Sequence, residues 1–519
     1  MFKKISLFNS VFIIYVFSGL NFLFSFVLQL ILAYYFGAKI EMDAYLVAVS
    51  IPMIIYGLIL SFEAVFVPAF KDLSFKVKGE ALNCLINTIF NLFVFILVII
   101  TCIILLLSPR IISFLAPGFS IQQRGLTVTL FYIMMPSVIF SGLAAFLSSA
   151  YHFREKFGLP AFITVANILV MIITTFLLRS TLGIKSLAWG VLFGSIVQFG
   201  ILFPVWAFRE RYKFIINFKQ KELLEICKRI LYLSIGAIFL SLILIFEKNL
   251  ASNLPEGSIS VLGYASKVIS IVVLFPSFAI PTVLLPQLSK YYALGEIDKL
   301  RGLLVRGIRM TFLFIIPLTI LLIVFRTPLV ILLFKRGAFD SVAVDNTSIT
   351  IICYLGLMIA MAISKTITMG FLAIHDVIVP SLLMILSFLV YICIAPFLSH
   401  ILSFKGLALA LSFSGIATIV VEFFILRKRL KGIEGKELTK SFLKISLSSL
   451  AMGLVSLIVF RALPSFAIMG ETLDLVLRLT IATLGGFLVF NIISFMLRLN
   501  ELRFTYEAVY LRFGSFLKK

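Results

Sequence analysis

Charged residues are scarce in this chain of 519 residues, and acidic residues are scarcer than basic ones. Asp, Glu, Lys and Arg make up 13% of the sequence, whereas 61% is hydrophobic and the mean hydropathy is +1.16. This composition excludes a soluble globular protein, because no single soluble core buries so large an apolar fraction. It is typical of a protein that crosses a membrane many times.

Cysteine and histidine are also scarce. The five cysteines show no C-x-x-C spacing, and the three histidines lie far apart at positions 152, 375 and 400. A structural metal site needs several closely spaced Cys or His ligands. We therefore expect the cysteines to pack as small hydrophobic side chains, and we expect neither a bound metal nor a cofactor.

Long apolar runs are abundant. A hydrocarbon core about 30 Å thick needs roughly 20 apolar residues per helix. The sequence therefore predicts an all-α polytopic membrane protein with fourteen transmembrane helices, an even number that places both termini on one side. The predicted spans are 10–35, 45–69, 86–107, 128–150, 159–178, 187–208, 230–250, 260–284, 310–334, 347–372, 378–398, 404–426, 441–462 and 472–497.

Basic residues are unequally distributed over the loops between these spans. With the N-terminus placed in the cytoplasm, the inside segments hold 30 Lys and Arg, and the outside loops together with the outer parts of their adjoining spans hold 11. Cytoplasmic loops of membrane proteins carry such an excess. The net charge of +22 therefore indicates a topology with both termini cytoplasmic, and it does not indicate nucleic-acid binding.

Landmark residues recur at one nearly constant offset along the chain. The paired landmarks are Pro68 and Pro286, Pro109 and Pro328, Pro160 and Pro380, and Lys185 and Lys405. This offset covers six predicted spans, and an even number returns the chain to the same side of the membrane. The pattern predicts two parallel repeats related by an axis along the membrane normal.

The repeats define a domain organisation. We predict an N-terminal six-helix lobe at 1–208, a cytoplasmic interfacial linker at 209–229, a C-terminal six-helix lobe at 230–430, and two additional helices with an amphipathic cytoplasmic tail at 431–519. The linker mixes seven basic residues with apolar ones, as interfacial helices do. Two such lobes usually enclose a central cavity that opens alternately to each side.

Four of the charged residues within predicted spans are candidate functional residues. A charge facing lipid at the span centre costs about 2.5 to 3.5 kcal/mol, so a cavity-facing position is favoured for Lys267. A cation there would select anions. Lys365 lies nearer the cytoplasmic end of its span and reaches water more easily. We interpret Glu63 and Glu247 as counter-ions or ion-coupling sites.

An enzymatic alternative rests on Glu41 and Asp43 in the first outside loop. Membrane glycosyltransferases that use lipid-linked sugars place an acidic metal-binding pair in such a loop. The loops of this chain are all short, so no extramembrane catalytic domain is expected, and a second acidic cluster is missing.

Seven segments resemble, in order and spacing, the signature segments of the MurJ (MviN) family of lipid II flippases, within the multidrug/oligosaccharidyl-lipid/polysaccharide exporter superfamily. They are "YYFGAKIEMDAYLVAVSIP", "FVPAF", "FLAPGF", "ASNLPEGSISVLGYASK", "TVLLPQLSKYYALGEIDKLRGLL", "LLFKRGAFD" and "FLAIHDVIVP". The resemblance runs through all fourteen predicted spans and is densest from about 245 to 380.

The resemblance implies a monomeric flippase in the bacterial cytoplasmic membrane. Its partners would be membrane lipids and a polyprenyl-pyrophosphate-linked glycan, moved from the inner to the outer leaflet. Lys267 falls where the family usually has a cavity arginine, which implies contact with the pyrophosphate. Asp43 matches the family's acid after "FGA", Lys365 a frequent lysine, and Glu247 an aspartate that some members use in a sodium site.

The chain also departs from the family. The first two spans of the family normally carry several cavity arginines, but no Lys or Arg lies between Lys4 and Lys39 or between Lys39 and Lys71. Polar partners of the sodium site align with Tyr391 and Ala395, so coupling to Na⁺, H⁺ or the membrane potential stays open. Two other functions also stay open: flipping of another lipid-linked oligosaccharide, and ion-driven small-molecule antiport.

Overall fold

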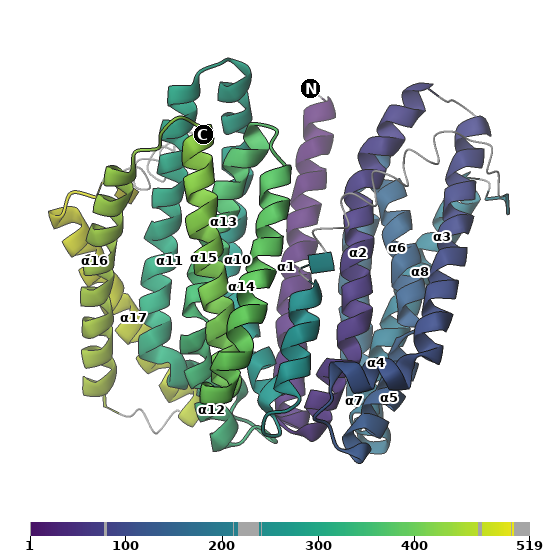
Figure 1. Ribbon diagram of the computed structural model, residues 1–519, viewed down its shortest axis with the longest axis horizontal. Coiled ribbons are helices and arrows are strands. Elements are labelled where there is room, and N and C mark those ends of the chain that lie inside the picture. Colours follow the sequence, from purple (N-terminus) through teal and green to yellow (C-terminus); the bar gives the residue numbers. More distant parts are fainter. Residues whose placement is uncertain are drawn as a thin grey trace. The chain divides into compact units, whose positions relative to one another are not determined.

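The computed structural model describes residues 2–76, 80–210, 212–215, 238–239, 241–464, 470–499 and 501–502. Over these ranges the regular elements are helices, without a strand among them (Figure 1). The all-α class is thus confirmed over the described residues. Two compact units divide the chain: unit 1 comprises Met1–Ser260 and Arg336–Phe339, and unit 2 comprises Val261–Lys335 and Asp340–Lys519.

Unit 1 is a helical bundle in which α7 packs along both α8 and α1, and α2 packs on α5 and α6. Gly190 and Gly194, one helical turn apart on α8, let its backbone approach α7 closely. A Cβ atom at Gly194 would lie only 2.9 Å from the carbonyl oxygen of Asn167. The helices are α1 (Phe2–Phe36), α2 (Ile40–Lys76), α3 (Glu80–Leu106), α4 (Ser108–Leu115), α5 (Ile121–Met134), α6 (Ser137–Phe153), α7 (Gly158–Leu182), α8 (Lys185–Glu210) and a further helix at 241–251.

Unit 2 is a second bundle, in which α15 packs on α13 and α14, and α16 packs on α11 and α17. Its core includes Leu304, Phe371 and Leu426. The helices are α10 (Ser258–Ala293), whose first turn belongs to unit 1, α11 (Ile297–Phe334), α12 (Ser341–Cys353), α13 (Leu355–Ala373), α14 (Ile378–Leu402), α15 (Phe404–Arg429), α16 (Gly435–Ala462) and α17 (Glu471–Met496).

Helix α10 carries three internal prolines, Pro276, Pro281 and Pro286. Proline removes a backbone hydrogen bond and its ring pushes against the preceding turn, so helices bend there. The parts Ser258–Leu274 and Ala279–Ala293 are bent by 48° relative to each other. The apolar run that contains Lys267 is therefore a broken helix.

Twelve helices among the described residues are long and apolar enough to cross a membrane, and the bent α10 makes up to thirteen. The predicted span at 230–250 lies partly outside the described residues. Two predicted spans consist of two helices each: 128–150 falls on α5 and α6, and 347–372 falls on α12 and α13. The total of fourteen stays a prediction.

The linker predicted at 209–229 lies mostly outside the described residues, as does the tail from 503 onward. The described piece 212–215 is not helical. It contacts α3, because the Tyr212 hydroxyl donates to Asn91 Oδ1 at 2.8 Å and Asn91 Nδ2 donates to the Ile215 carbonyl at 3.0 Å.

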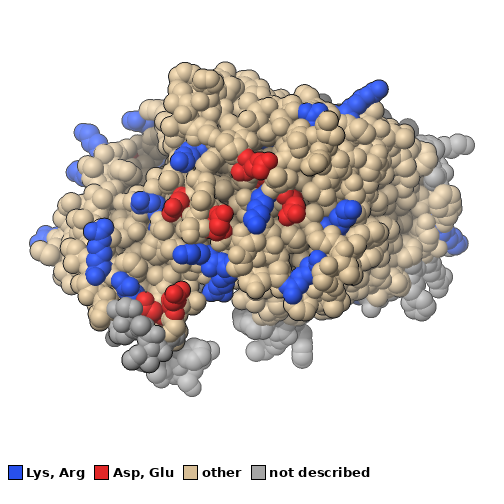
Figure 2. Space-filling view, turned by 90° about the horizontal axis from the view of Figure 1, so that it is seen from below, with Lys and Arg blue, Asp and Glu red and all other residues tan. Residues whose placement is uncertain are grey.

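Figure 2 shows the end of the molecule that is at the bottom of Figure 1, where α1 ends and α2 begins. Acidic and basic side chains are interspersed on this face, within a surface that is mostly uncharged.

Candidate functional site

Asp43 lies in the first turn of α2 and is 3% exposed. Both oxygens of its carboxylate accept hydrogen bonds. Its Oδ2 accepts a hydrogen bond from the Gly257 backbone N–H at 2.7 Å. Its Oδ1 accepts from the Ser260 backbone N–H at 2.7 Å and from the Ser260 hydroxyl. Gly257 and Ser260 lie at the start of α10, so Asp43 on α2 acts as an N-terminal cap of α10. A negative charge at this end also interacts favourably with the helix dipole.

Two glycines at this position allow the backbones to touch. A Cβ atom at Gly257 would lie 2.4 Å from the carbonyl oxygen of Ala38, and one at Gly37 would lie 2.3 Å from that of Ala338. Both glycines have positive φ, +83° and +58°, a conformation that glycine adopts without steric clash. The separation of Gly37 and Gly257 along the chain equals that of Lys185 and Lys405, so these glycines follow the predicted duplication.

A second pair of glycines repeats this relation. A Cβ atom at Gly118 would lie 2.2 Å from the carbonyl oxygen of Ser252, and one at Gly337 would lie 2.2 Å from that of Tyr34. The Ala338 N–H donates to the Tyr34 carbonyl at 2.8 Å. Gly118 and Gly337 are separated along the chain by the same offset as the landmark pair Pro109 and Pro328. Each predicted repeat therefore contributes the same type of glycine contact to the other.

Glu247 and Lys248 lie beside this cap. Both are buried, and Lys248 Nζ donates to Glu247 Oε1 at 3.4 Å. The Lys248 cation also interacts favourably with Asp43. We call the group Asp43, Glu247, Lys248, Gly257 and Ser260 the junction site. It brings together two of the predicted site residues, Asp43 and Glu247, with one cation, Lys248, that is paired with Glu247 and attracts Asp43.

The junction site does not have the form of a metal site. Both carboxylate oxygens of Asp43 accept hydrogen bonds, and Glu41 is exposed. Over the described residues, no group of three or more His, Cys, Asp or Glu is placed to hold a metal ion. The two acids therefore differ in role: the Asp43 carboxylate is buried and structural, and the Glu41 carboxylate faces solvent.

The other predicted site residues lie elsewhere. Lys267 is half-buried on α10, and Lys365 is exposed on α13; within the described part of the chain neither makes a hydrogen bond or an ion pair. Glu63 lies in α2, but its side chain is outside the described residues.

Sequence reasoning missed Glu422, a buried acid on α15. It is 2% exposed, and the Thr368 hydroxyl on α13 donates to its Oε1 at 2.9 Å. Its Oε2 has no hydrogen-bond partner in the described part of the molecule. The available signal was a single acid within the apolar run 404–426, a type of residue that is functional by default in membrane helices.

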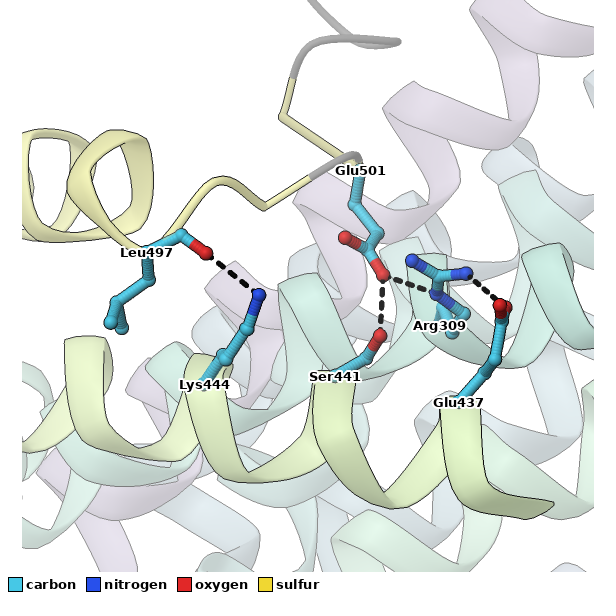
Figure 3. Close-up of polar contacts among 6 residues, drawn as sticks. All are labelled: Arg309, Glu437, Ser441, Lys444, Leu497 and Glu501. Atoms are coloured by element: carbon cyan, nitrogen blue, oxygen red, sulfur yellow. Dashed lines mark hydrogen bonds and ion pairs between the residues drawn. The ribbon is translucent and has the colours of Figure 1, made fainter.

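A second missed cluster joins α16 to α11 (Figure 3). The Arg309 guanidinium on α11 donates to Glu501, which follows α17, and to Glu437 on α16, the latter at 2.9 Å. The Ser441 hydroxyl donates to the same Glu501 oxygen at 2.8 Å. Lys444 Nζ donates to the Leu497 carbonyl at 2.8 Å, which ties the end of α17 to α16.

This cluster gives a pH-dependent contribution to stability. Burial alone would raise the pKa of Glu501, but the hydrogen bonds from Arg309 and Ser441 outweigh it and hold the pKa below its ordinary value of 4.5. A carboxyl group whose pKa is lower in the folded state stabilises that state above the unfolded pKa, and the contribution is lost as the pH falls through the folded value. We expect Glu501→Gln to cost about 1 to 2 kcal/mol at neutral pH.

The measurement is the unfolding midpoint of both proteins from neutral to acidic pH. The difference between wild type and Glu501→Gln should shrink upon acidification below 4.5. Glu437→Gln is the matched control: because Glu437 is 55% exposed, its replacement should change little at any pH. A difference for Glu501→Gln that stays constant with pH would contradict the assignment.

Solved structures with a similar fold are transporters. "Inward-facing conformation of a multidrug resistance MATE family transporter of the MOP superfamily" matches with a TM-score of 0.70, at 14% identity, over 81% of this chain and 96% of that one. "Lipid II flippase MurJ, inward closed conformation" matches with a TM-score of 0.79, at 24% identity, over 93% and 98%. The chain therefore has the fold of these transporters, and its many long apolar helices are those of a multi-pass membrane protein.

The family model described as "Lipid II flippase MurJ" matches residues 32–477. The chain therefore belongs to the lipid II flippase MurJ family. Among curated relatives, the "Probable lipid II flippase MurJ" of Buchnera aphidicola subsp. Schizaphis graminum is 26% identical over 91% of this chain and 94% of its own length. The "Lipid II flippase MurJ" of Burkholderia cenocepacia is 26% identical over 77% and 80%.

Proposed function

We propose that this protein is a lipid II flippase, which moves the lipid-linked peptidoglycan precursor across the membrane. The observation that carries this proposal is the match of the flippase family to residues 32–477, a range that contains helices α2 to α16 in full. A transporter of this family is not an enzyme, and its role lies in peptidoglycan and cell wall biogenesis.

The finer arrangement is part of the proposal. We propose fourteen spans, two parallel six-helix lobes followed by two additional helices, both termini in the cytoplasm, and a monomer in the bacterial inner membrane that works by alternating access. The excess of basic residues in alternate loops supports the orientation. The nearly constant offset between landmark residues and the two reciprocal glycine contacts support the repeats.

Substrate binding is assigned first to Lys267, a cation on the broken helix α10 that has no ion-pair partner among the described residues. A pyrophosphate in a site of low dielectric constant needs opposite charge nearby, and Lys267 can supply it. Lys365 and Glu63 are assigned to the same path from the sequence alone. Asp43 has a different role here: its hydrogen bonds to Gly257 and Ser260 make it a clamp on the helix that carries Lys267.

Ion coupling is assigned to Glu247, with the ion left open. Its carboxylate is paired with Lys248 at 3.4 Å. A sodium ion or a proton that binds Glu247 would therefore have to displace Lys248, and the released lysine could then compensate Asp43 alone. This competition provides a physical route by which an ion would act on the cap of α10.

Complementation tests the function. The wild-type protein, expressed in a bacterium whose own lipid II flippase can be depleted, should restore growth and cell shape. The absence of Lys and Arg from α1 after Lys4, and from α2 before Lys71, favours one rival, a flippase for another lipid-linked glycan. Failure of a well-expressed, correctly inserted protein to rescue would overturn lipid II as the substrate, and mass spectrometry of copurified lipids would identify the glycan that it carries.

A further inference from the structure

Unit 1 contains a polar pocket that neither the junction site nor Lys267 explains. It has a volume of about 290 Å³ and is formed by α1, α2, α6, α7 and α8. Eight of its thirteen lining residues are polar, and all are uncharged at neutral pH: Asn21, Tyr56, Ser137, Ser141, Thr164, Asn167, Ser195 and Gln198. So many polar groups inside one membrane bundle are costly and need a use.

The hydrogen bonds already made show what the pocket can still offer. Ser141, Thr164 and Ser195 donate their hydroxyl protons to carbonyl groups of their own helices. A hydroxyl oxygen that donates in this way keeps lone pairs with which to accept. Three acceptors from three different helices therefore line the pocket.

The amide side chains add donors. Asn167 Nδ2 donates to Gln198 Oε1 at 3.1 Å, a bond that fixes both side chains. The Gln198 amino group can still donate hydrogen bonds, and Asn167 Oδ1 can still accept them. Asn21 Oδ1 is a buried acceptor with no partner in the described part of the chain. The pocket thus presents donors and acceptors together.

The backbone of α8 holds this amide pair in place. A Cβ atom at Gly194 would lie 2.9 Å from the Asn167 carbonyl oxygen and 3.1 Å from its Oδ1. Gly190, one turn earlier, faces Met171 with similarly little space. Asn167 is therefore positioned by the close approach of α7 and α8, as a specific polar contact requires.

The lining also limits the ligand. Neither Lys nor Arg lines the pocket, so a pyrophosphate or a carboxylate would lie there uncompensated. The volume is near the lower end of ligand pockets, roughly 300 Å³, and suits one sugar ring rather than a whole headgroup. A ligand that is uncharged, small and rich in hydroxyl and amide groups fits the chemistry.

We propose that this pocket binds an N-acetylated sugar of the lipid-linked precursor, with Asn167 and Gln198 reading its acetamido and hydroxyl groups. This inference rests on the proposed function and deepens it, since it separates recognition of the glycan from recognition of the pyrophosphate. The N-terminal lobe of this chain lacks cations in its first two spans, and it recognises the sugar through uncharged polar side chains.

The test compares two ligands on the purified full-length protein: lipid II, and undecaprenyl pyrophosphate, which has the same lipid and pyrophosphate but no sugar. The double variant Asn167→Leu with Gln198→Leu should bind lipid II at least about 10-fold more weakly, the equivalent of about 1.4 kcal/mol, and should bind undecaprenyl pyrophosphate as wild type does. Asn491→Leu replaces an amide on α17, in unit 2 and outside the pocket lining. It is the control and should alter neither affinity.

Two serine variants protect the test against misfolding. Ser141→Ala and Ser195→Ala remove single hydroxyl groups with almost no change in volume, and each should weaken lipid II binding several-fold while sparing undecaprenyl pyrophosphate. Folded variants that bind lipid II as tightly as wild type would overturn the pocket assignment, and so would equal losses for both ligands. If the wild type binds neither lipid, the proposed function itself fails.

Discussion

Asp43→Ala is expected to destabilise the protein by about 2 to 5 kcal/mol, because the change removes the acceptor for three hydrogen bonds at the start of α10. Two of these bonds come from backbone N–H groups. Each buried donor left without a partner costs about 1 to 3 kcal/mol. The measurement is the unfolding midpoint of the detergent-solubilised protein, together with rescue of flippase-depleted cells, which should be lost.

Two further variants define the cause. Asp43→Asn keeps one acceptor oxygen but turns an amino group toward a backbone donor, so it should fall between wild type and Asp43→Ala. Glu41→Ala removes an exposed acid from the same turn and should change stability by no more than about 0.5 kcal/mol. Equal effects at 41 and 43 would mean that charge in this loop matters and that the cap does not.

Lys267→Ala is expected to weaken lipid II binding by about 10-fold to 100-fold, since a hydrogen bond to a charged group is worth about 1.5 to 3 kcal/mol. The described structure offers Lys267 no competing acid. Lys267→Arg should bind at least as tightly as wild type, because a guanidinium meets phosphate oxygens with two parallel hydrogen bonds. Affinity for lipid II and rescue of depleted cells are the measurements.

The control is Lys290→Ala, an exposed lysine in the last turn of the same helix. It should keep wild-type affinity, since long-range attraction between exposed charges is screened by salt. If Lys267→Ala binds lipid II unchanged, the cation lies off the substrate path. The pyrophosphate would then have to be held by groups other than the one that replaces the family's arginine.

Most helices could be predicted from the sequence, but their ends could not. The span predicted at 159–178 is α7 at Gly158–Leu182, because here the apolar run and the helix coincide. In contrast, α11 begins at Ile297, well before the span predicted to start at 310. Hydropathy locates the part of a helix that needs lipid, whereas the helix itself continues through polar turns that pair with other helices.

Interruptions of spans were predictable only where a proline causes them. The break between α5 and α6 falls at Met135 and Pro136, and Pro136 cannot continue the hydrogen-bond ladder. The break at Tyr354 between α12 and α13 has no proline or glycine at its centre. Packing against other helices determines the position of this break, and no local sequence pattern predicts it.

Only the two acids of the junction site, Asp43 and Glu247, were predicted from the sequence. Resemblance to the family pointed to Asp43 and Glu247, but the partners of Asp43 lie 214 and 217 residues further along the chain. No spacing rule connects residues so far apart. The polar pocket escaped notice for a related reason: isolated Asn, Gln and Ser residues in apolar runs are unremarkable until the fold gathers them from five helices.

The cap of α10 also has a consequence for biosynthesis. Asp43 is translated 214 residues before Gly257 and 217 residues before Ser260, and Tyr34 waits still longer for Ala338. At roughly 5 to 20 residues per second, the ribosome needs roughly 10 to 40 seconds to deliver the missing donors to Asp43. During that interval the first helices are already made, while Asp43, in the first turn of α2, lacks the donors that it binds in the folded protein.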